Sequence, residues 1–231
     1  MLKFVSRIAA VAWFAQLRPM VLPQLVIIGA GGFGREMLAW AEQSVQLGHE
    51  WTIKGFIDDN LDALAGKKTR APVLGRGQDY QPSSGEVFIC AMGTPAFKRG
   101  CSELIESRGG RFTQLIHRTA VLGHEVELEP GAVLCPYAII SGYNRLGKGV
   151  AVNLHSSVDH DAIIDDWTQL NCHCDLMGSV VIGKEVFFGS HVAVTPGVNV
   201  GDGAFLGAGT MVLRNVEAGA KIAGVPGRRI E

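Results

Sequence analysis

Large apolar residues recur at every sixth position through the last two fifths of the 231-residue chain, and the run has no break. Four residues after each of them comes a second register of mostly small side chains, from which only Asn144 departs. A helix has a period of 3.6 residues and a strand a period of 2, so neither produces this spacing. The two registers therefore indicate a repeat architecture. The large register is Ile116, Leu122, Leu128, Leu134, Ile140, Leu146, Val152, Val158, Ile164, Leu170, Leu176, Ile182, Phe188, Val194, Val200, Leu206 and Val212.

A six-residue repeat predicts a short strand followed by a sharp turn, and three such units close one triangular coil. Successive coils stack by parallel strand pairing, about 4.8 Å apart. We expect the large residue to point inward and the small residue to let the three walls approach, so that the coils share one core. Several glycines follow the large residue directly, where a turn that needs positive φ is expected. They are Gly147, Gly183, Gly189, Gly201 and Gly207.

The N-terminal third has a different pattern. Gln24 to Gly34 reads as a buried strand and a glycine-rich turn, and Arg35 to Trp40 continues with helical character. This is the opening of a Rossmann-like unit, whose backbone amides at the helix start favour a phosphate. The second strand, Trp51 to Asp58, runs into Gly-Phe-Ile-Asp-Asp rather than into a single ribose-binding acid, and a third strand covers Val87 to Met92. Only about 100 residues precede the repeat, too few for a full NAD-binding fold.

Composition narrows the function classes. The chain is 47% hydrophobic and 19% charged, has 30 glycines, and carries a net charge of −1, which suits a glycine-punctuated repeat protein and gives no reason to expect nucleic acid. The cysteines number five, an odd count without framework spacing, which favours a reducing, cytoplasmic compartment.

The first 21 residues form an uncertain extension. Lys3, Arg7 and Arg18 flank an apolar run from Ile8 to Leu17 that is too short to span a bilayer. We interpret it as the product of an upstream start, with Met20 as the true beginning. A helix lying on a membrane surface is the second interpretation, and a signal peptide is a third.

Three features together resemble a known family. They are Gly-Ala-Gly-Gly-Phe-Gly-Arg-Glu from Gly29, the Gly-Phe-Ile-Asp-Asp strand end, and the six-residue repeat ending in Ala-Gly-Val-Pro-Gly-Arg at Arg228. From about Leu22 to Ile230 the chain resembles the hexapeptide-repeat sugar acetyltransferases that include sialic acid O-acetyltransferases and nucleotide-4-amino-sugar N-acetyltransferases. The resemblance implies an α/β Rossmann-like nucleotide-sugar domain over residues 22–112 and a left-handed parallel β-helix over 113–231. It also implies acetyl-CoA as acyl donor, a homotrimer and no metal.

The same resemblance assigns the nucleotide-sugar site by position. Gly29, Gly31 and Gly32 would cradle the diphosphate, and Gly93 would border the same pocket. Asp58 and Asp59 would meet the nucleoside, and a purely structural strand-end turn is an equal alternative for these two aspartates.

Acyl transfer needs a base for the nucleophile's proton, and histidine is the natural base near neutral pH. His160 matches the family's catalytic histidine and lies two residues past the inward Val158, on a turn and therefore outside the prism. Asp161 would orient the imidazole, and Asp159 is an equally close acid in the sequence. The competing interpretation is a solvated turn histidine.

Three other histidines share one phase of the repeat. His155, His173 and His191 are each three residues past a large residue, so they are predicted to lie above one another at the coil spacing. This ladder would line the coenzyme A groove or reflect turn chemistry alone. A metal site that uses Cys172 and Cys174 is disfavoured, since Cys174 is predicted to point inward.

The resemblance also assigns residues to acetyl-CoA. The expected set is His173, Gly178, Gly189 and Gly207. Some family members carry a second histidine nine residues beyond the catalytic one, where this chain has Gln169. The role of that position in placing the acyl group either is lost here or passes to His173.

We therefore predict an N-acetyltransferase for a nucleotide-linked 4-amino sugar of surface polysaccharide or glycan biosynthesis. O-acetylation of sialic acid or another sugar hydroxyl is the alternative within the same class. A non-catalytic β-helix scaffold and an NAD-dependent dehydrogenase are weaker hypotheses. The expected partners are the nucleotide sugar and two further copies of the chain, with membrane contact possible only through residues 1–20.

Overall fold

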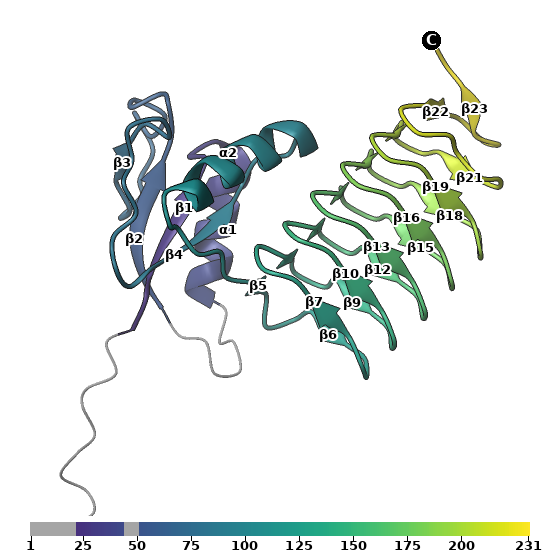
Figure 1. Ribbon diagram of the computed structural model, residues 1–231, viewed down its shortest axis with the longest axis horizontal. Helices are drawn as coiled ribbons and strands as arrows, with labels where there is room; N and C mark the ends of the chain where they lie inside the picture. The colour runs from purple at the N-terminus through teal and green to yellow at the C-terminus, as the bar shows by residue number, and fades with distance from the viewer. Residues whose placement is uncertain (1–21, 44–50) are drawn as a thin grey trace, which may run out of the picture.

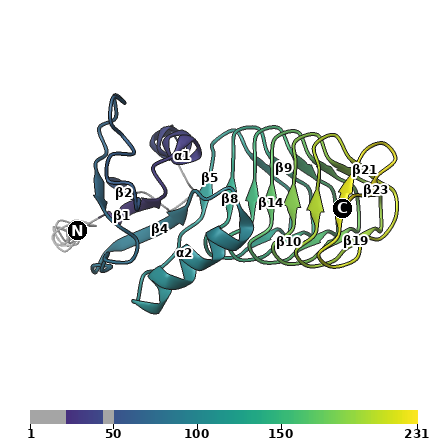
Figure 2. The ribbon, with the colours of Figure 1, turned by 90° about the horizontal axis from the view of Figure 1, so that it is seen from above.

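The computed structural model describes residues 22–43 and 51–231, which form a small α/β domain followed by a long triangular prism (Figure 1). The extension predicted over residues 1–21 lies outside the described residues. Figure 2 shows the α/β domain beside the first coils of the prism and the C-terminus at its far end.

The α/β domain has a four-stranded parallel sheet in the order β3-β2-β1-β4. The three predicted strands are present, and the short β3 is an addition that no sequence pattern indicated. In chain order the elements are β1 (Gln24–Ile28), α1 (Gly32–Gln43), β2 (Thr52–Ile57), β3 (Val73–Gly75), β4 (Glu86–Cys90) and α2 (Pro95–Ser107).

The prism has three walls of two-residue strands, each paired in parallel with the strand one coil away. The first wall contains β5 (Leu115–Ile116), β8 (Val133–Leu134), β11 (Ala151–Val152), β14 (Gln169–Leu170), β17 (Phe187–Phe188), β20 (Phe205–Leu206), β22 (Lys221–Ala223) and the antiparallel β23 (Arg228–Arg229). The second wall contains β6 (Val121–Leu122), β9 (Ile139–Ile140), β12 (Ser157–Val158), β15 (Asp175–Leu176), β18 (Ala193–Val194) and β21 (Met211–Val212). The third wall contains β7 (Glu127–Leu128), β10 (Arg145–Leu146), β13 (Ile163–Ile164), β16 (Val181–Ile182) and β19 (Asn199–Val200).

The predicted inward register is confirmed from Leu134 onward, because every large residue from there to Val212 is buried. The first coil differs. Leu122 is exposed, and Ile116 and Leu128 are half-buried, because no earlier coil covers the inner side of these residues. Asn144, the one departure in the small register, is buried, and both polar atoms of its side chain are hydrogen-bonded. The nitrogen donates to the Ser141 carbonyl (2.9 Å) and the oxygen accepts from the Ala162 amide (2.7 Å).

The glycines that follow the large residues do not supply positive φ, so that expectation was wrong. They allow close approach instead: a Cβ on Gly183 would lie 2.7 Å from the Asp202 nitrogen, and one on Gly201 would lie 2.5 Å from the Ala218 nitrogen. Positive φ falls two residues later, at fifteen consecutive turns. These are Glu125, Gly131, Tyr137, Tyr143, Gly149, His155, Asp161, Trp167, His173, Ser179, Glu185, His191, Gly197, Gly203 and Gly209.

The α/β domain packs on the first wall. The outward residues of its first strands, Leu115, Val133 and Ala151, are buried in one cluster with Leu25 and Phe56 of the sheet. The next outward residue, Gln169, is also buried, whereas Phe205 farther along the wall is exposed. Among the described residues, the α/β domain therefore covers the early coils of the first wall, while outward residues of the other two walls such as Ile139 and Ile163 are exposed.

A buried carboxylate holds the edge of the α/β sheet. Lys54 of β2 reaches the side chain of Glu86 on β4, which also accepts hydrogen bonds from the Tyr80 hydroxyl (3.1 Å) and the Ser83 amide (2.9 Å). Burial by itself raises the pKa of Glu86, but the hydrogen bonds from Lys54, Ser83 and Tyr80 outweigh it and leave the pKa below its usual value.

We expect Glu86→Gln to lower the free energy of unfolding at pH 7 by about 1–3 kcal/mol, since charge-assisted hydrogen bonds are lost. A carboxylate with a depressed folded pKa stabilises the fold above its unfolded pKa of about 4.3, and this contribution is lost as the pH falls through the folded value. Urea unfolding at pH 7 and at pH 3.5 checks both statements. A difference between wild type and variant that stays constant across that range would contradict the assignment.

Candidate functional site

His160 and Asp161 form a close pair on the second corner of the prism, the edge between the second and third walls. His160 Nδ1 and Asp161 Oδ2 are 2.7 Å apart, and both side chains are exposed. The Asp161 amide donates to the Gly142 carbonyl (3.2 Å), which holds the aspartate in its turn. With Nδ1 held by the carboxylate, Nε2 is left to accept a proton. The structure thus favours Asp161 over Asp159 as the partner of the imidazole.

The imidazole of His160 lies against the next coil, because the residue eighteen positions later, Gly178, has no side chain. A Cβ on Gly178 would be 2.7 Å from Cε1 of His160 and 2.8 Å from Nε2. A shallow hollow of about 440 Å³ opens beside the ring, and His124 and Tyr143 contribute to its lining. The sequence analysis assigned Gly178 only to acetyl-CoA binding. Its contact with His160 arises because residues eighteen positions apart stack on successive coils.

The predicted histidine ladder is present on the first corner, the edge between the first and second walls. The ring centroids of His155 and His173 are 5.1 Å apart and those of His173 and His191 are 4.8 Å apart, with interplanar angles of 3°. Tyr137 extends the stack by one ring at 4.9 Å. The ladder and His160 therefore occupy different corners of the same prism.

The glycine turn after β1 is open where the sequence predicted a phosphate cradle. Nothing lies within 4 Å of a Cβ placed on Gly31, Gly32 or Gly93. The turn is fixed from below, since the Ala30 amide donates to Asp58 Oδ2 (2.8 Å).

Both predicted nucleoside-binding aspartates already hold backbone amides. The second oxygen of Asp58 accepts from the Asn60 amide (2.9 Å), and Asp59 Oδ1 accepts from the Gly77 amide (3.1 Å). The structural alternative for these residues is thus realised, and it leaves their remaining acceptor positions for a ligand. A separate hollow of about 530 Å³, which the sequence analysis missed, lies between α1 and the segment before β3, and Glu42 contributes an acid to its lining. It includes Arg35, Lys67, Lys68 and Arg70.

Within one chain, the glycine turn and His160 do not meet. The α/β domain packs on the first wall, whereas His160 lies on the opposite edge of the prism, between the other two walls. The residues predicted for the nucleotide sugar and for catalysis therefore belong to separate surfaces of the chain.

Comparisons with known proteins agree with both parts of this fold. The PglD N-terminal domain family matches residues 24–105, and the family of the hexapeptide repeat of succinyl-transferase matches residues 179–214. The chain is 28% identical over 214 residues to a GDP-perosamine N-acetyltransferase from Escherichia coli O157:H7, covering 89% of this chain and 95% of that protein. The chain thus combines a PglD-type N-terminal domain with a hexapeptide-repeat domain, the arrangement of the acetyltransferases to which it is similar over most of its length.

Two solved structures resemble this acetyltransferase over most of its length. The acetyltransferase domain of PglB from Neisseria gonorrhoeae FA1090 is 26% identical with a TM-score of 0.82, over 90% of this chain and 100% of that chain, and was also solved in complex with acetyl coenzyme A. PerB from Caulobacter crescentus, in complex with CoA and GDP-perosamine, shares the fold with 23% identity and a TM-score of 0.78, over 90% of this chain and 97% of that one. The hand of the β-helix is accordingly left.

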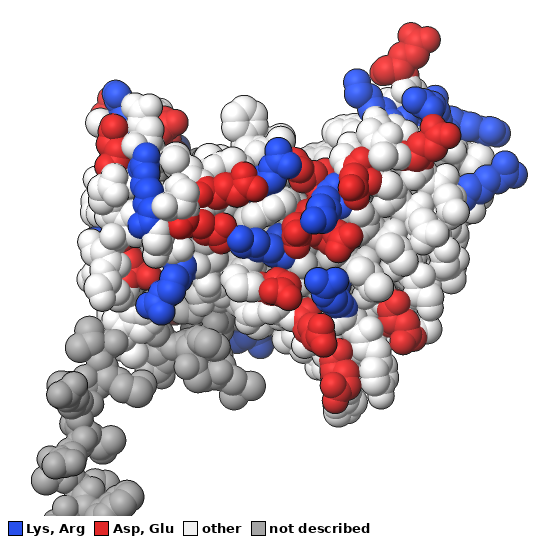
Figure 3. Space-filling view, in the orientation of Figure 1, with Lys and Arg blue, Asp and Glu red and all other residues white. Residues whose placement is uncertain are grey.

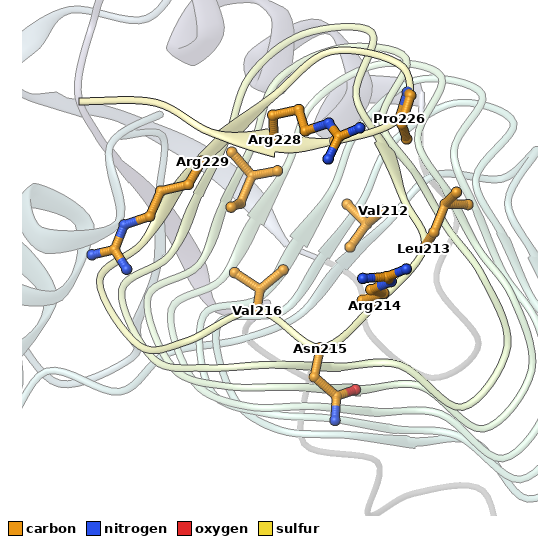
Figure 4. A pocket seen from close by; sticks show the side chains of 10 residues that line it. Val212, Leu213, Arg214, Asn215, Val216, Pro226, Arg228 and Arg229 are labelled. Atoms are coloured by element: carbon orange, nitrogen blue, oxygen red, sulfur yellow. The ribbon is translucent and has the colours of Figure 1, made fainter.

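The C-terminal end of the acetyltransferase is open and basic. Figure 4 shows Arg214, Arg228 and Arg229 around a hollow of about 380 Å³ whose floor includes Val212 and Val216. Basic side chains also gather at this end in the space-filling view (Figure 3). Elsewhere on that face, acidic and basic side chains alternate.

Within residues 22–43 and 51–231, no group of three or more His, Cys, Asp or Glu side chains is placed to hold a metal ion. In the same part of the chain, no helix has the length and apolar character needed to cross a membrane.

Gln169, which stands where some relatives were expected to carry a second histidine, links the two domains. It is buried on the first wall, and its Oε1 accepts from the Lys98 ammonium of α2 (2.7 Å). Lys98 also donates to the Gly149 carbonyl (3.1 Å) and is itself buried. Burial lowers the pKa of Lys98 to about 8. The sequence could not reveal this link, because the two side chains are 71 residues apart.

We expect the Lys98 amine to make stability depend on pH between about 8 and 10. Its pKa is lower in the folded than in the unfolded chain, where it is about 10.4, so the unfolded state binds more protons in this window. Relative to a Lys98→Met variant, the wild type should therefore gain unfolding free energy as the pH rises from 8 to 10. Urea unfolding at several pH values measures the difference.

A Lys148→Met variant is the matched control for this measurement. Lys148 is a half-buried lysine paired with Glu106 of α2 at 2.6 Å. It should keep the pH-dependent gain of the wild type. Parallel curves for wild type and Lys98→Met would contradict the role assigned to Lys98.

Proposed function

We propose that the chain transfers an acetyl group from acetyl-CoA to the amine of a nucleotide-linked 4-amino sugar. The observation that supports this most is the His160–Asp161 pair, exposed beside a hollow on the hexapeptide prism of a chain that is similar over most of its length to a GDP-perosamine N-acetyltransferase. The setting we infer is cytoplasmic synthesis of a surface polysaccharide or glycan.

The proposed mechanism is direct attack without a covalent enzyme intermediate. The sugar amine attacks the thioester carbonyl while Nε2 of His160 removes a proton from the nitrogen. Asp161 stabilises the imidazolium and keeps Nε2 directed outward. When the tetrahedral intermediate collapses, the C–S bond breaks and the thiolate of coenzyme A takes up the proton that His160 carried. Atoms and charge balance without a metal or redox partner.

We propose the same substrate-binding residues that the sequence predicts. We assign the diphosphate to Gly29, Gly31 and Gly32, the nucleoside to Asp58 and Asp59, and the edge of this pocket to Gly93. The open space over Gly31 and Gly32 supports the first assignment, whereas a Cβ placed on Gly29 would lie 3.2 Å from the end of the Met92 side chain. For acetyl-CoA we assign His173, Gly178, Gly189 and Gly207, with the domain division at residues 112 and 113.

The α/β domain and the His160 corner are separate surfaces of one chain. If the sugar sits on the α/β domain and the base lies at the far edge of the prism, the reaction requires a neighbouring copy to bring them together. We therefore propose a homotrimer in which each active site combines the α/β domain of one protomer with His160 of its partner. Exposed apolar side chains around the His160 corner supply surface for this contact, among them Val121, Ile139, Tyr143 and Ile163.

The reaction and its acceptor are tested by following thiol release from acetyl-CoA. The panel contains UDP-, dTDP- and GDP-linked 4-amino sugars, with free sialic acid alongside. Turnover on one amino sugar supports the proposal. Activity on sialic acid alone would instead establish O-acetylation, and coenzyme A that fails to bind would favour a non-catalytic scaffold.

We expect His160→Asn to lower kcat by about 100-fold or more while KM changes little, since general base catalysis contributes about 10²–10⁴-fold. Asp159→Asn, which removes the neighbouring acid that does not contact the ring, should keep wild-type kcat. Steady-state kinetics on the preferred acceptor gives both values. A mild effect of His160→Asn would overturn its assignment as the base.

Subunit complementation tests the shared active site. His160→Asn removes the base, and Gly31→Asp places a carboxylate in the proposed diphosphate cradle, so each homotrimer should be inactive. Co-expressed and purified as mixed trimers, the two variants should regain a measurable fraction of wild-type activity, because some sites then combine an intact cradle with an intact base. Size-exclusion chromatography with light scattering reports the oligomer, and mixed trimers that stay inactive would contradict the shared site.

A further inference from the structure

The second corner carries another histidine in the same phase as His160. His124 lies two coils earlier, and Gly142 is the residue between them in the stack. Backbone hydrogen bonds hold the three turns in register: the Tyr143 amide donates to the His124 carbonyl (2.8 Å), and the Asp161 amide donates to the Gly142 carbonyl (3.2 Å). The corner therefore presents two imidazoles, separated by a position that has no side chain.

The space over Gly142 is open. Apart from its neighbours in the chain, only backbone atoms of His124 lie within 4 Å of a Cβ placed there, the oxygen at 3.2 Å and the nitrogen at 3.7 Å. The His160 ring lies against the later coil instead, where a Cβ on Gly178 would meet it at 2.7 Å. The side chain of His160 is 65% exposed, and on the side of the earlier coils it borders the hollow of about 440 Å³.

This hollow combines an apolar lining with an imidazole at each end. Val121, Ile139 and Tyr143 line it, and all three are exposed. His124 and His160 also line it from turns two coils apart, which is about 10 Å at the usual strand spacing. Within residues 22–43 and 51–231, no hydrogen bond or ion pair joins the His124 side chain to another residue. This imidazole is therefore available to a ligand in the hollow.

A pyranose ring has the chemistry that this hollow complements. Its C–H faces are apolar and pack on aromatic and aliphatic side chains, here Tyr143 and Ile139, whereas its hydroxyl groups project from the edge of the ring. A hydroxyl that is held against an apolar surface needs a hydrogen-bond partner, because an unpaired buried polar group is costly. The imidazole of His124 can donate to such a hydroxyl or accept from it.

We propose that His124 binds a ring hydroxyl of the acceptor sugar and thereby selects which sugar His160 deprotonates. This assignment rests on the proposed acetyl transfer to a nucleotide-linked amino sugar, and it names a residue that recognises the sugar itself. With the amine at Nε2 of His160, the sugar ring occupies the level of Gly142 and its hydroxyl reaches His124. The diphosphate leaves the hollow toward the neighbouring copy, whose contact with Val121 and Ile139 closes the outer side.

We expect His124→Ala to lower kcat/KM for the preferred acceptor by about 10-fold, since a hydroxyl of the bound sugar loses its partner. KM for acetyl-CoA should keep its wild-type value, because the residues assigned to the donor lie on later coils. His124→Gln, whose side-chain amide also forms hydrogen bonds, should restore most of the loss. Glu125→Ala is the matched control, since Glu125 is the exposed neighbour of His124 but does not line the hollow. It should match the wild type, and thermal melts confirm that all variants are folded.

Deoxygenated acceptors distinguish a hydrogen bond from a structural role. Analogues that each lack one ring hydroxyl are compared in the wild type and in His124→Ala. One analogue should lose about 10-fold in kcat/KM with the wild type and nothing further with the variant, because the variant has already lost that hydrogen bond. Equal losses in both proteins with every analogue would overturn the assignment, and so would an unchanged kcat/KM in His124→Ala.

Binding without turnover separates failure of this site from failure of the proposed function. NMR follows the ring signals of isotope-labelled histidines, assigned from the spectra of His124→Gln and His160→Asn. The UDP-, dTDP- and GDP-linked 4-amino sugars are added in turn without acetyl-CoA. A shift of the His124 signal that saturates with one of these sugars supports the site, even if no acetyl group is transferred afterwards. A sugar that shifts only the His160 signal overturns it, and so does a panel that moves neither signal.

Discussion

Hydrogen bonding between coils fixes the place of every side chain in the prism. The Gly147 amide donates to the Ile164 carbonyl at 2.7 Å, the Gly183 amide donates to Val200 at 2.8 Å, and the same pairing continues along all three walls. A residue therefore lies directly over the one eighteen positions later. This constraint produces the continuous aliphatic core, because each inward side chain packs on its equivalents above and below. It also produces the stacked rings outside, so core and ladder have one origin.

The second determinant is the wall on which the α/β domain packs. Covering the first wall turns its outward positions into core, which is why Gln169 is buried and accepts a hydrogen bond from a buried lysine instead of facing solvent. The same packing leaves the His160 corner uncovered. Two ion pairs support the contact at its margin, Arg99 with Glu185 at 2.5 Å and Lys148 with Glu106 at 2.6 Å. Exposed or half-exposed pairs of this kind contribute little, so the apolar cluster and the buried Lys98 hold the domains together.

The sequence was sufficient for features that depend on spacing alone. The six-residue period gave the coils, the inward residues from Leu134 onward and the ladder of His155, His173 and His191 at the predicted separation. It was insufficient where a residue's environment comes from elsewhere in the chain. The exposure of Leu122 follows from the absence of an earlier coil, and the contact between Lys98 and Gln169 follows from domain packing. The positive-φ position was also misplaced, because tight packing between coils selects glycine as strongly as turn conformation does.

In a repeat with identical backbone at every turn, chemistry is specified by the positions that break the pattern of side chains. Gly178 removes a side chain from the level below His160, and this lets the imidazole lie against the prism with Nδ1 on Asp161. Gly209 removes a ring from the ladder in the same way and leaves the face of His191 open. Both omissions lie one coil beyond a histidine, on two corners that are separate within a single prism. Because a rigid stack of coils holds these corners at a fixed orientation, the two open positions face away from each other on separate edges of one prism, and a change in the repeat at one corner leaves the other corner unaltered.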